Sequence, residues 1–464
     1  ILHSLPRENR FQSTKTGGKQ QSAIRETVRK TSSLYSRKSP PGRQPAQTLE
    51  YLNLLIGLYL PHFELTWIMS KPSNNPFVRE LPPAEALLLA CARSAMTPAE
   101  LVRARELAAG VDWHEVERLA EDHGVGSLAY RNLRRHFEDM APAEMIERLK
   151  ILSIATTQSN LSLLKEVLFT VRELGAQGIE CTVFKGLITT QLAYGDFSAR
   201  KCGDIDLLVP ESDYPRAKEL FLAEGFLSTM SDKAEIACLQ SGLWHEDRRL
   251  KIDLHWGIPP RELGIHAGEI LRNRAYTTLG GMKIPTFSRD DMFLILCVNA
   301  TKEFWEQRLY AYCDIREFLL HHQDLDWGLI AGRARALRCE RMLMAALGVV
   351  HTLYDMPLPA LIAARLRETP SVRRVIDELL EQLFNLNPAR AVAGGGDRHL
   401  YFFRSSPGYF AALIDNPVRR FYYKTVLRHV LSVTPEAEGE DASRSAHVLI
   451  LLLKKLYRKI TNQT

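Results

Sequence analysis

The chain has 464 residues, of which 45% are hydrophobic and 25% are charged. These values are typical of an ordinary globular protein, and the length allows two or three domains. The formal net charge is +6, but residues 1–68 carry ten Lys and Arg against four acids, so the whole excess lies there. Residues 69–464 are neutral overall, which argues against binding to nucleic acid through general basic charge.

Residues 1–68 differ in composition from the rest of the chain. Residues 3–46 are rich in Ser, Thr, Gln, Lys, Arg and Pro and poor in acids, which is typical of disorder. The apolar stretch 51–69 contains Pro61, His62 and Glu64, and its uninterrupted part is too short to span a bilayer. We expect 1–68 to be a leader outside the functional fold, translated ahead of a start at Met69. The alternative is a targeting segment or a surface anchor.

The seven cysteines show no C-x-x-C spacing, and their number is odd. This pattern indicates neither a disulfide framework nor a zinc site, and it favours buried thiols in a reducing compartment. We therefore expect a cytoplasmic protein with no stable membrane insertion.

Helical periodicity dominates residues 69–178, which we expect to form an N-terminal helical lobe. A helix with Pro in its first turn begins near Pro83, and two further helices in 112–137 are separated at Gly124. A long periodic run from Pro142 to about Leu174 predicts one extended helix.

The period then changes, and residues 179–285 are expected to form an α/β core. Strands are predicted at 179–184 and 204–209, and two more in 241–256 around a turn near Asp247 and Arg248. Short helices are predicted at 187–195 and 211–226. From Ser288 the pattern is helical again, which predicts a C-terminal helical lobe over 286–430, followed by a linker and a basic amphipathic helix in 431–464.

Two carboxylates, Asp204 and Asp206, lie in the predicted strand 204–209. Side chains at i and i+2 of a strand share a face, so the two project together and repel each other unless a cation lies between them. Asp253 in the later strand offers a third carboxylate. Three such ligands suit Mg²⁺ or Mn²⁺ and are typical of two-metal phosphoryl transfer.

Lys185 and Gly186 lie where a strand ends and a helix begins. Glycine allows a phosphate to approach the backbone, the helix start offers free N–H groups, and lysine adds a positive charge. Arg200, shortly before Asp204, is expected either to pair with the carboxylates or to contact phosphate. The sequence therefore predicts a bound nucleoside triphosphate, such as ATP, together with its metal ion.

These motifs in this order resemble the uncharacterised nucleotidyltransferase family with a K-G / D-x-D / D-L-H-W pattern, within the polymerase-β-like superfamily. The resemblance covers about 84–430. It implies an α+β fold, with a small mixed β-sheet flanked by N- and C-terminal helical lobes, and Asp204, Asp206 and Asp253 as metal ligands. The superfamily's usual Gly-Ser pair is Lys185-Gly186 here, so lysine replaces a serine contact to phosphate. Residues 297–302 also lack a histidine that the family often carries there.

The resulting hypothesis is a metal-dependent enzyme that transfers a nucleoside monophosphate from an NTP to an acceptor hydroxyl and releases pyrophosphate. Asp204, Asp206 and Asp253 are its expected catalytic residues, and Lys185, Gly186 and Arg200 its expected phosphate-binding residues. The alternatives are a catalytically silent nucleotide- or partner-binding protein and a toxin-like tRNA nucleotidyltransferase. The acceptor stays open among a protein, an RNA and a small molecule, as does the oligomeric state.

Four further residues each have two possible roles. His255 and Trp256 are expected to pack rather than react. Asp314 is expected either to accept structural hydrogen bonds or to line the nucleotide cleft, and Trp305 either to lie in the core or to stack on a base.

Overall fold

The computed structural model describes residues 81–258, 265–272, 274–302 and 308–384. All of them belong to one compact unit, Ser70–Thr464. The expected leader 1–68, Trp305, residues 385–430 of the C-terminal lobe and the expected terminal helix in 431–464 lie outside the described residues. No helix in the described ranges is both long and apolar enough to cross a membrane.

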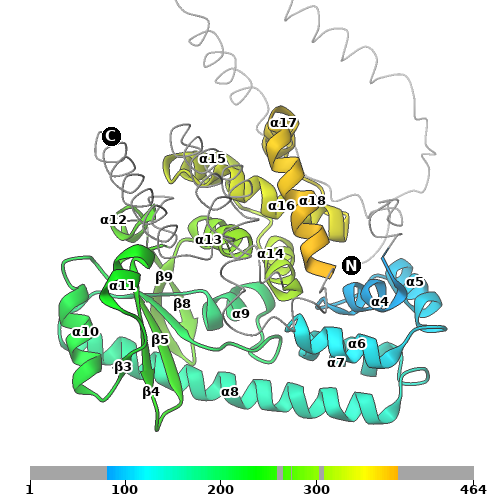
Figure 1. Cartoon of the computed structure of the whole chain (residues 1–464), viewed down its shortest axis with the longest axis horizontal. Coiled ribbons are helices and arrows are strands. Elements are labelled where there is room, and N and C mark those ends of the chain that lie inside the picture. The colour runs from blue at the N-terminus through cyan, green and yellow to red at the C-terminus, as the bar shows by residue number, and fades with distance from the viewer. Residues whose placement is uncertain (1–80, 259–264, 273, 303–307, 385–464) are drawn as a thin grey trace, which may run out of the picture. The chain divides into compact units, whose positions relative to one another are not determined.

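Four short helices come first in the described part (Figure 1): α4 Pro83–Cys91, α5 Pro98–Ala108, α6 Trp113–Asp122 and α7 Gly126–His136. Pro83 occupies the first turn of α4, where its missing N–H costs no hydrogen bond. Asp112 caps α6 by accepting hydrogen bonds from the first-turn N–H groups of that helix. Gly124, with φ of 67°, provides the break before α7, as the sequence predicts.

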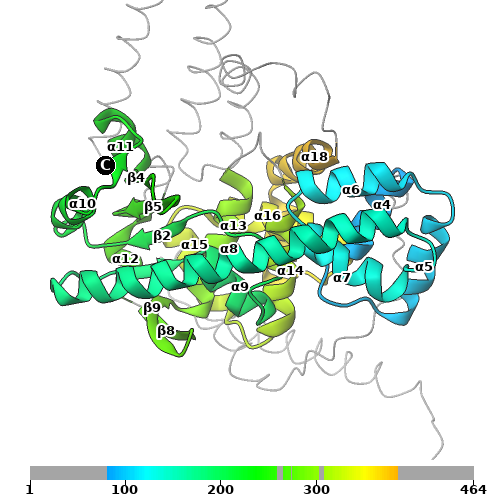
Figure 2. The ribbon, with the colours of Figure 1, turned by 90° about the horizontal axis from the view of Figure 1, so that it is seen from below.

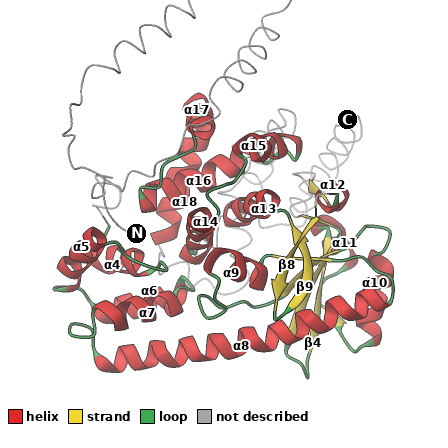
Figure 3. Ribbon diagram, turned by 180° about the vertical axis from the view of Figure 1, so that it is seen from behind, coloured by secondary structure: helices red, strands yellow, loops and turns green. Residues whose placement is uncertain are grey.

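The 34-residue helix α8, Ala143–Ala176, links these helices to the sheet. Figures 2 and 3 show α6 and α7 near one end of α8 and the strands near the other. Leu164 and Leu168 of α8 lie against Gly280 in a β-turn of the α/β region. Helix α8 thus packs against the N-terminal helices and against the α/β region.

A five-stranded mixed sheet forms the centre of the α/β region. Its order is β1-β2-β5-β4-β3, and only β2 and β5 run parallel. The strands are β1 Thr182–Phe184, β2 Ile205–Leu208, β3 Leu227–Ser228, β4 Gln240–His245 and β5 Leu250–His255. Helices α9 Gly186–Tyr194, α10 Tyr214–Ala223 and α11 Asp232–Cys238 lie between the strands in the chain. The predicted α+β fold class, with its small mixed sheet, is confirmed.

Smaller elements follow β5: a two-stranded pair β6 Gly257–Ile258 and β7 Ile265–His266, helix α12 Ala267–Leu271, and a hairpin of β8 Arg274–Leu279 and β9 Met282–Phe287. The hairpin turns at Gly280 and Gly281, both at positive φ (55° and 80°), which suits a tight turn between antiparallel strands. It lies beside β1, where the ring centroids of Phe184 and Phe287 are 4.9 Å apart. This hairpin is not among the elements predicted from the sequence.

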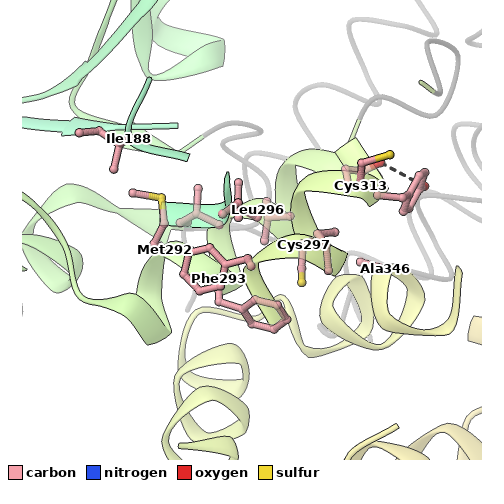
Figure 4. Packing of buried hydrophobic residues seen from close by; sticks show 14 of the residues in the cluster. Ile188, Met292, Phe293, Leu296, Cys297, Cys313 and Ala346 are labelled. Atoms are coloured by element: carbon pink, nitrogen blue, oxygen red, sulfur yellow. Dashed lines mark hydrogen bonds between the residues drawn. The ribbon is translucent and has the colours of Figure 1, made fainter. Parts of the chain in front are cut away.

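The remaining helices are α13 Arg289–Lys302, α14 Leu309–His321, α15 Trp327–Ala336, α16 Glu340–Tyr354, α17 Ala360–Glu368 and α18 Pro370–Phe384. Ser288 caps α13 by accepting a hydrogen bond from the Asp291 N–H, at 3.1 Å. Figure 4 shows Phe293 and Leu296 of α13 packed among side chains of α9, α14 and α16. A single hydrophobic core runs through the N-terminal helices, the sheet and these helices.

Candidate functional site

The register of β2 and β5 brings two aspartates together at the centre of the sheet. Asp206 and Asp253 are direct partners in this parallel pair. Because side chains alternate along a strand, Lys251 and His255 lie on the same face of β5 as Asp253. The expected convergence of Asp206 and Asp253 thus follows from neighbouring strands in matching register.

Asp206 is 5% exposed and has two cationic or hydrogen-bonding partners. Its Oδ1 atom is 2.6 Å from Lys185 Nζ and 3.2 Å from His255 Nε2. Burial alone would raise the pKa of Asp206, but the Lys185 ammonium and the imidazole of His255 outweigh it and hold the pKa well below its usual range. Asp206 is therefore a carboxylate at neutral pH.

His255 is 1% exposed, and burial lowers its pKa, an effect that the nearby Asp206 carboxylate opposes. The imidazole is therefore neutral at pH 7. Because Asp206 can only accept, His255 must donate its hydrogen bond through Nε2–H. His255 also packs edge-on against Phe184, at 5.1 Å between ring centroids. It acts as a support for Asp206.

Asp204 joins the site through Lys251, which is not among the site residues predicted from the sequence. Lys251 Nζ lies 3.2 Å from Asp204 Oδ2 and 2.9 Å from Asp253 Oδ2, so one ammonium bridges both carboxylates. Burial, followed by the charges of Asp206 and Asp253, raises the pKa of Asp204. The negative charges of Asp206 and Asp253 thus disfavour ionisation of Asp204.

The donor set fits a divalent cation. Ligand atoms of Asp206, Asp253 and His255 lie within 4.8 Å of one another, and Asp204 is outside that group. Asp253 Oδ1 is buried and has no hydrogen-bond partner, which is costly for a carboxylate oxygen unless a ligand completes its environment. Carboxylate oxygens in this number suit Mg²⁺ or Mn²⁺.

Lys185 and Gly186 form a strained turn between β1 and α9. Lys185 has φ of 54° and ψ of −151°, a region that residues other than glycine rarely occupy. Gly186 also has positive φ, and a Cβ built there would lie 3.4 Å from the Asp204 carbonyl oxygen. The turn directs the Lys185 ammonium to Asp206 and across the Phe184 ring, 4.8 Å from its centroid. Such strain is often found at ligand sites.

The structure places Arg200 against helix α14. Arg200 Nε is 2.9 Å from Asp314 Oδ2, and its guanidinium lies over the ring of Tyr310. Tyr194 donates a hydrogen bond to the other Asp314 oxygen, at 2.9 Å. Burial is the largest cause that raises the pKa of Asp314, to about 6. These contacts favour a structural role for Arg200 and Asp314 over the phosphate contact expected for Arg200.

Asn160 of α8 holds the same loop and was missed in the sequence. Its side-chain amide donates to the carbonyl oxygens of Phe197 and Arg200, at 2.6 and 2.8 Å, and accepts from the Cys202 N–H at 2.9 Å. The sequence feature that could have indicated Asn160 is its place as a polar residue on the inner, apolar face of a predicted helix. Asn160 and Asp314 together fix the loop that leads into Asp204.

The matching family model is described as an uncharacterised nucleotidyltransferase, and it covers residues 109–355, more than half of the chain. Asp204, Asp206 and Asp253 and the strained turn at Lys185 and Gly186 all lie inside that range. The chain therefore belongs to the uncharacterised nucleotidyltransferase family, and the family predicted from the motifs is confirmed. A search of curated proteins found no match.

Two solved structures show weak similarity to the chain. One is an antigenic nucleotidyltransferase-like protein from Paracoccidioides brasiliensis, with 14% identity, a TM-score of 0.29, and coverage of 50% of this chain and 97% of that one. The other is the antibiotic-resistance factor ANT(2'')-Ia, with 14% identity, a TM-score of 0.28, and coverage of 39% of this chain and 92% of that one. The family assignment rests on the family match.

Proposed function

We propose that the protein is a metal-dependent nucleotidyltransferase that transfers a nucleoside monophosphate from an NTP, such as ATP, to an acceptor hydroxyl and releases pyrophosphate. The observation that carries the proposal is the buried Asp206–Asp253 pair on adjacent parallel strands, with Asp253 Oδ1 unpartnered. Family membership supports the reaction class. The odd number of cysteines and their lack of C-x-x-C spacing favour a reducing environment, which supports a cytoplasmic location.

Asp206 and Asp253 would hold the cation, with Asp204 at the edge of the same site. When bound, divalent ions in such sites activate the attacking oxygen and neutralise charge on the phosphates. Lys185 and His255 keep Asp206 ionised and oriented. Asp253 would also accept the proton of the acceptor hydroxyl.

The start of α9 would bind the triphosphate. Gly186 begins the helix, so its first N–H groups have no partner within the helix, and the helix dipole favours an anion there. Because Gly186 has no side chain, a phosphate could come close to the backbone at this residue. Lys185, which contacts Asp206, would share its ammonium between that carboxylate and a phosphate oxygen.

Radiolabel transfer tests the reaction. The protein is incubated with each α-labelled NTP, with Mg²⁺ or Mn²⁺ and with cell extract as the source of acceptor, and labelled products are separated. Wild-type protein should transfer the label to an acceptor, and the Asp253→Asn variant should show no transfer. Asp247→Asn is the matched control because Asp247 is an exposed acid in the β4–β5 turn, away from the acidic face. It should leave transfer unchanged.

The alternative of a silent binding protein makes a different prediction in the same experiment. Nucleotide would bind to wild-type protein, as measured by equilibrium dialysis, yet no acceptor would become labelled under any condition. Labelling that survives Asp253→Asn would also reject the proposed mechanism.

A further inference from the structure

Lys251 lies between Asp253, a proposed metal ligand, and Asp204 at the edge of the same site. Its ammonium contacts Oδ2 of Asp204 and Oδ2 of Asp253, on the face of the sheet that also carries Asp206. A lysine in that place supplies positive charge where the proposed function requires a divalent ion. The alternation of β5, with Lys251 two residues before Asp253, makes this contact a direct consequence of the sequence.

The charges of the site show why such an ion pair forms. Three carboxylates, Asp204, Asp206 and Asp253, face two ammonium groups, those of Lys185 and Lys251. Lys185 pairs with Asp206, and Lys251 is shared between Asp204 and Asp253, so one negative charge stays uncompensated. A divalent ion bound to Asp253 would approach Lys251 closely, and two cations at such a distance repel each other.

The two lysines differ in their freedom to move. The Lys185 side chain is 13% exposed and is held at the strained turn over the ring of Phe184. The Lys251 side chain is 41% exposed, and its Asp204 partner is 33% exposed. A half-exposed lysine on a four-carbon stem can turn into solvent without disturbing the core.

We infer that Lys251 is a built-in counter-ion of the acidic site, which competes with the divalent cation for Asp204 and Asp253 and turns away when the cation binds. This inference rests on the proposed function and deepens it, because it assigns the residue that limits metal affinity. Lys251 keeps the site intact without metal, and it prevents tight binding of a cation until the nucleotide arrives with its own negative charge.

Mn²⁺ binding without nucleotide tests the inference. Isothermal titration with Mn²⁺ compares wild type with Lys251→Met, which keeps most of the aliphatic stem, and Lys251→Arg, which keeps the charge. Removing the competing charge should tighten Mn²⁺ binding on the order of tenfold. Lys251→Arg should stay near wild type. The control is Lys283→Met, which removes an exposed lysine of β9 that lies over the ring of Tyr276 on β8, and it should bind Mn²⁺ as wild type does.

Thermal unfolding adds a readout that a merely structural lysine would not produce. Without metal, Lys251→Met should melt below wild type because two carboxylates lose their counter-ion. Mn²⁺ should then raise its melting temperature by more than it raises that of wild type. Unchanged or weaker Mn²⁺ binding by Lys251→Met would overturn the inference and make Lys251 a permanent ion-pair partner.

Asp253→Asn separates this inference from the proposed function. If Asp253→Asn binds Mn²⁺ as well as wild type does, the proposed metal site is wrong, whatever Lys251 does. If Asp253→Asn loses binding while Lys251→Met equals wild type, the site stands and the inference fails. No Mn²⁺ binding by wild type and Lys251→Met would overturn both.

Discussion

At the scale of single residues, Lys185 has two properties that a mutation can separate. Its ammonium pairs with Asp206, and its backbone occupies a conformation suited to glycine. Lys185→Met and Lys185→Gly both remove the charge, but only glycine removes the strain. Urea unfolding without metal should therefore find Lys185→Gly more stable than Lys185→Met by about 1–2 kcal/mol. The reverse order would show that the turn is not strained.

Arg200 and Asp314 form a buried ion pair, so removing one partner leaves an uncompensated charge. Arg200→Met should lower the free energy of unfolding by about 3 kcal/mol. Adding Asp314→Asn should recover part of that loss, since Tyr194 can still donate to the amide oxygen. Arg274→Met, which breaks a more exposed pair with Glu180, should cost less than about 1 kcal/mol. Unchanged stability with weaker nucleotide binding would restore the phosphate role expected for Arg200.

Alternation along a strand is a local property, so it predicted that Asp204 and Asp206 share a face. The pairing of Asp206 with Asp253 depends on the register of two strands far apart in sequence, which no local pattern determines. Lys251 and His255 lie two residues before and after Asp253, so strand alternation also puts them on its face of the sheet. A lysine on a strand usually points into solvent, so its residue type alone did not indicate that Lys251 contacts the aspartates of the site.

At the scale of elements, His123 joins the end of α6 to the start of α14. It is fully buried, and its Nδ1 accepts a hydrogen bond from the Leu309 N–H at 3.3 Å. Burial, with smaller effects of Arg118 and Arg308, lowers its pKa from 6.5 to about 4. Between these values the unfolded chain binds the extra proton, so protein stability falls as the pH decreases through this window.

This linkage gives a measurable pH dependence. Between pH 7 and pH 5, His123 should account for a loss of about 2 kcal/mol in the free energy of unfolding. Urea unfolding of wild type and of His123→Gln at both pH values isolates the contribution of His123 to the free energy of unfolding, because glutamine cannot take up the proton. Equal pH dependence in the two proteins would show that His123 is not held neutral by the fold.

The elements differ in how well the sequence predicted them. Helix α8 and the β4–β5 pair have long, regular patterns and were found close to their observed bounds. The hairpin β8–β9 was missed although Gly280-Gly281 is a turn signal. Its strands are partly exposed and carry mixed side chains, so the apolar alternation is weak.

At the scale of the whole molecule, the described lobes share one hydrophobic core. The sequence suggested separate helical and α/β segments because the period changes between them. Contacts between segments, such as the hydrogen bond from the Ser94 N–H to Glu317 at 3.3 Å, join residues distant in sequence and leave no local pattern. The small mixed sheet was predicted from the family resemblance and not from local sequence patterns.

Deletion of residues 1–68 tests the proposed boundary near Met69. Because these residues differ in composition and charge from the rest of the chain, the shortened protein should keep cooperative unfolding and the same nucleotide transfer. Differential scanning calorimetry provides the first measurement and the labelling assay the second. A broad, non-cooperative transition would show that 1–68 belongs to the fold.

The central claim is that Asp206 and Asp253 jointly bind a divalent cation that serves a nucleotide. Anomalous diffraction from crystals grown with Mn²⁺ and a non-hydrolysable NTP tests it most directly. The account predicts an anomalous peak about 2 Å from an oxygen of each carboxylate, with Lys251 turned away from Asp253 and phosphate oxygens at the start of α9. A nucleotide bound elsewhere, with no peak at these carboxylates and Lys251 still between Asp204 and Asp253, would contradict it.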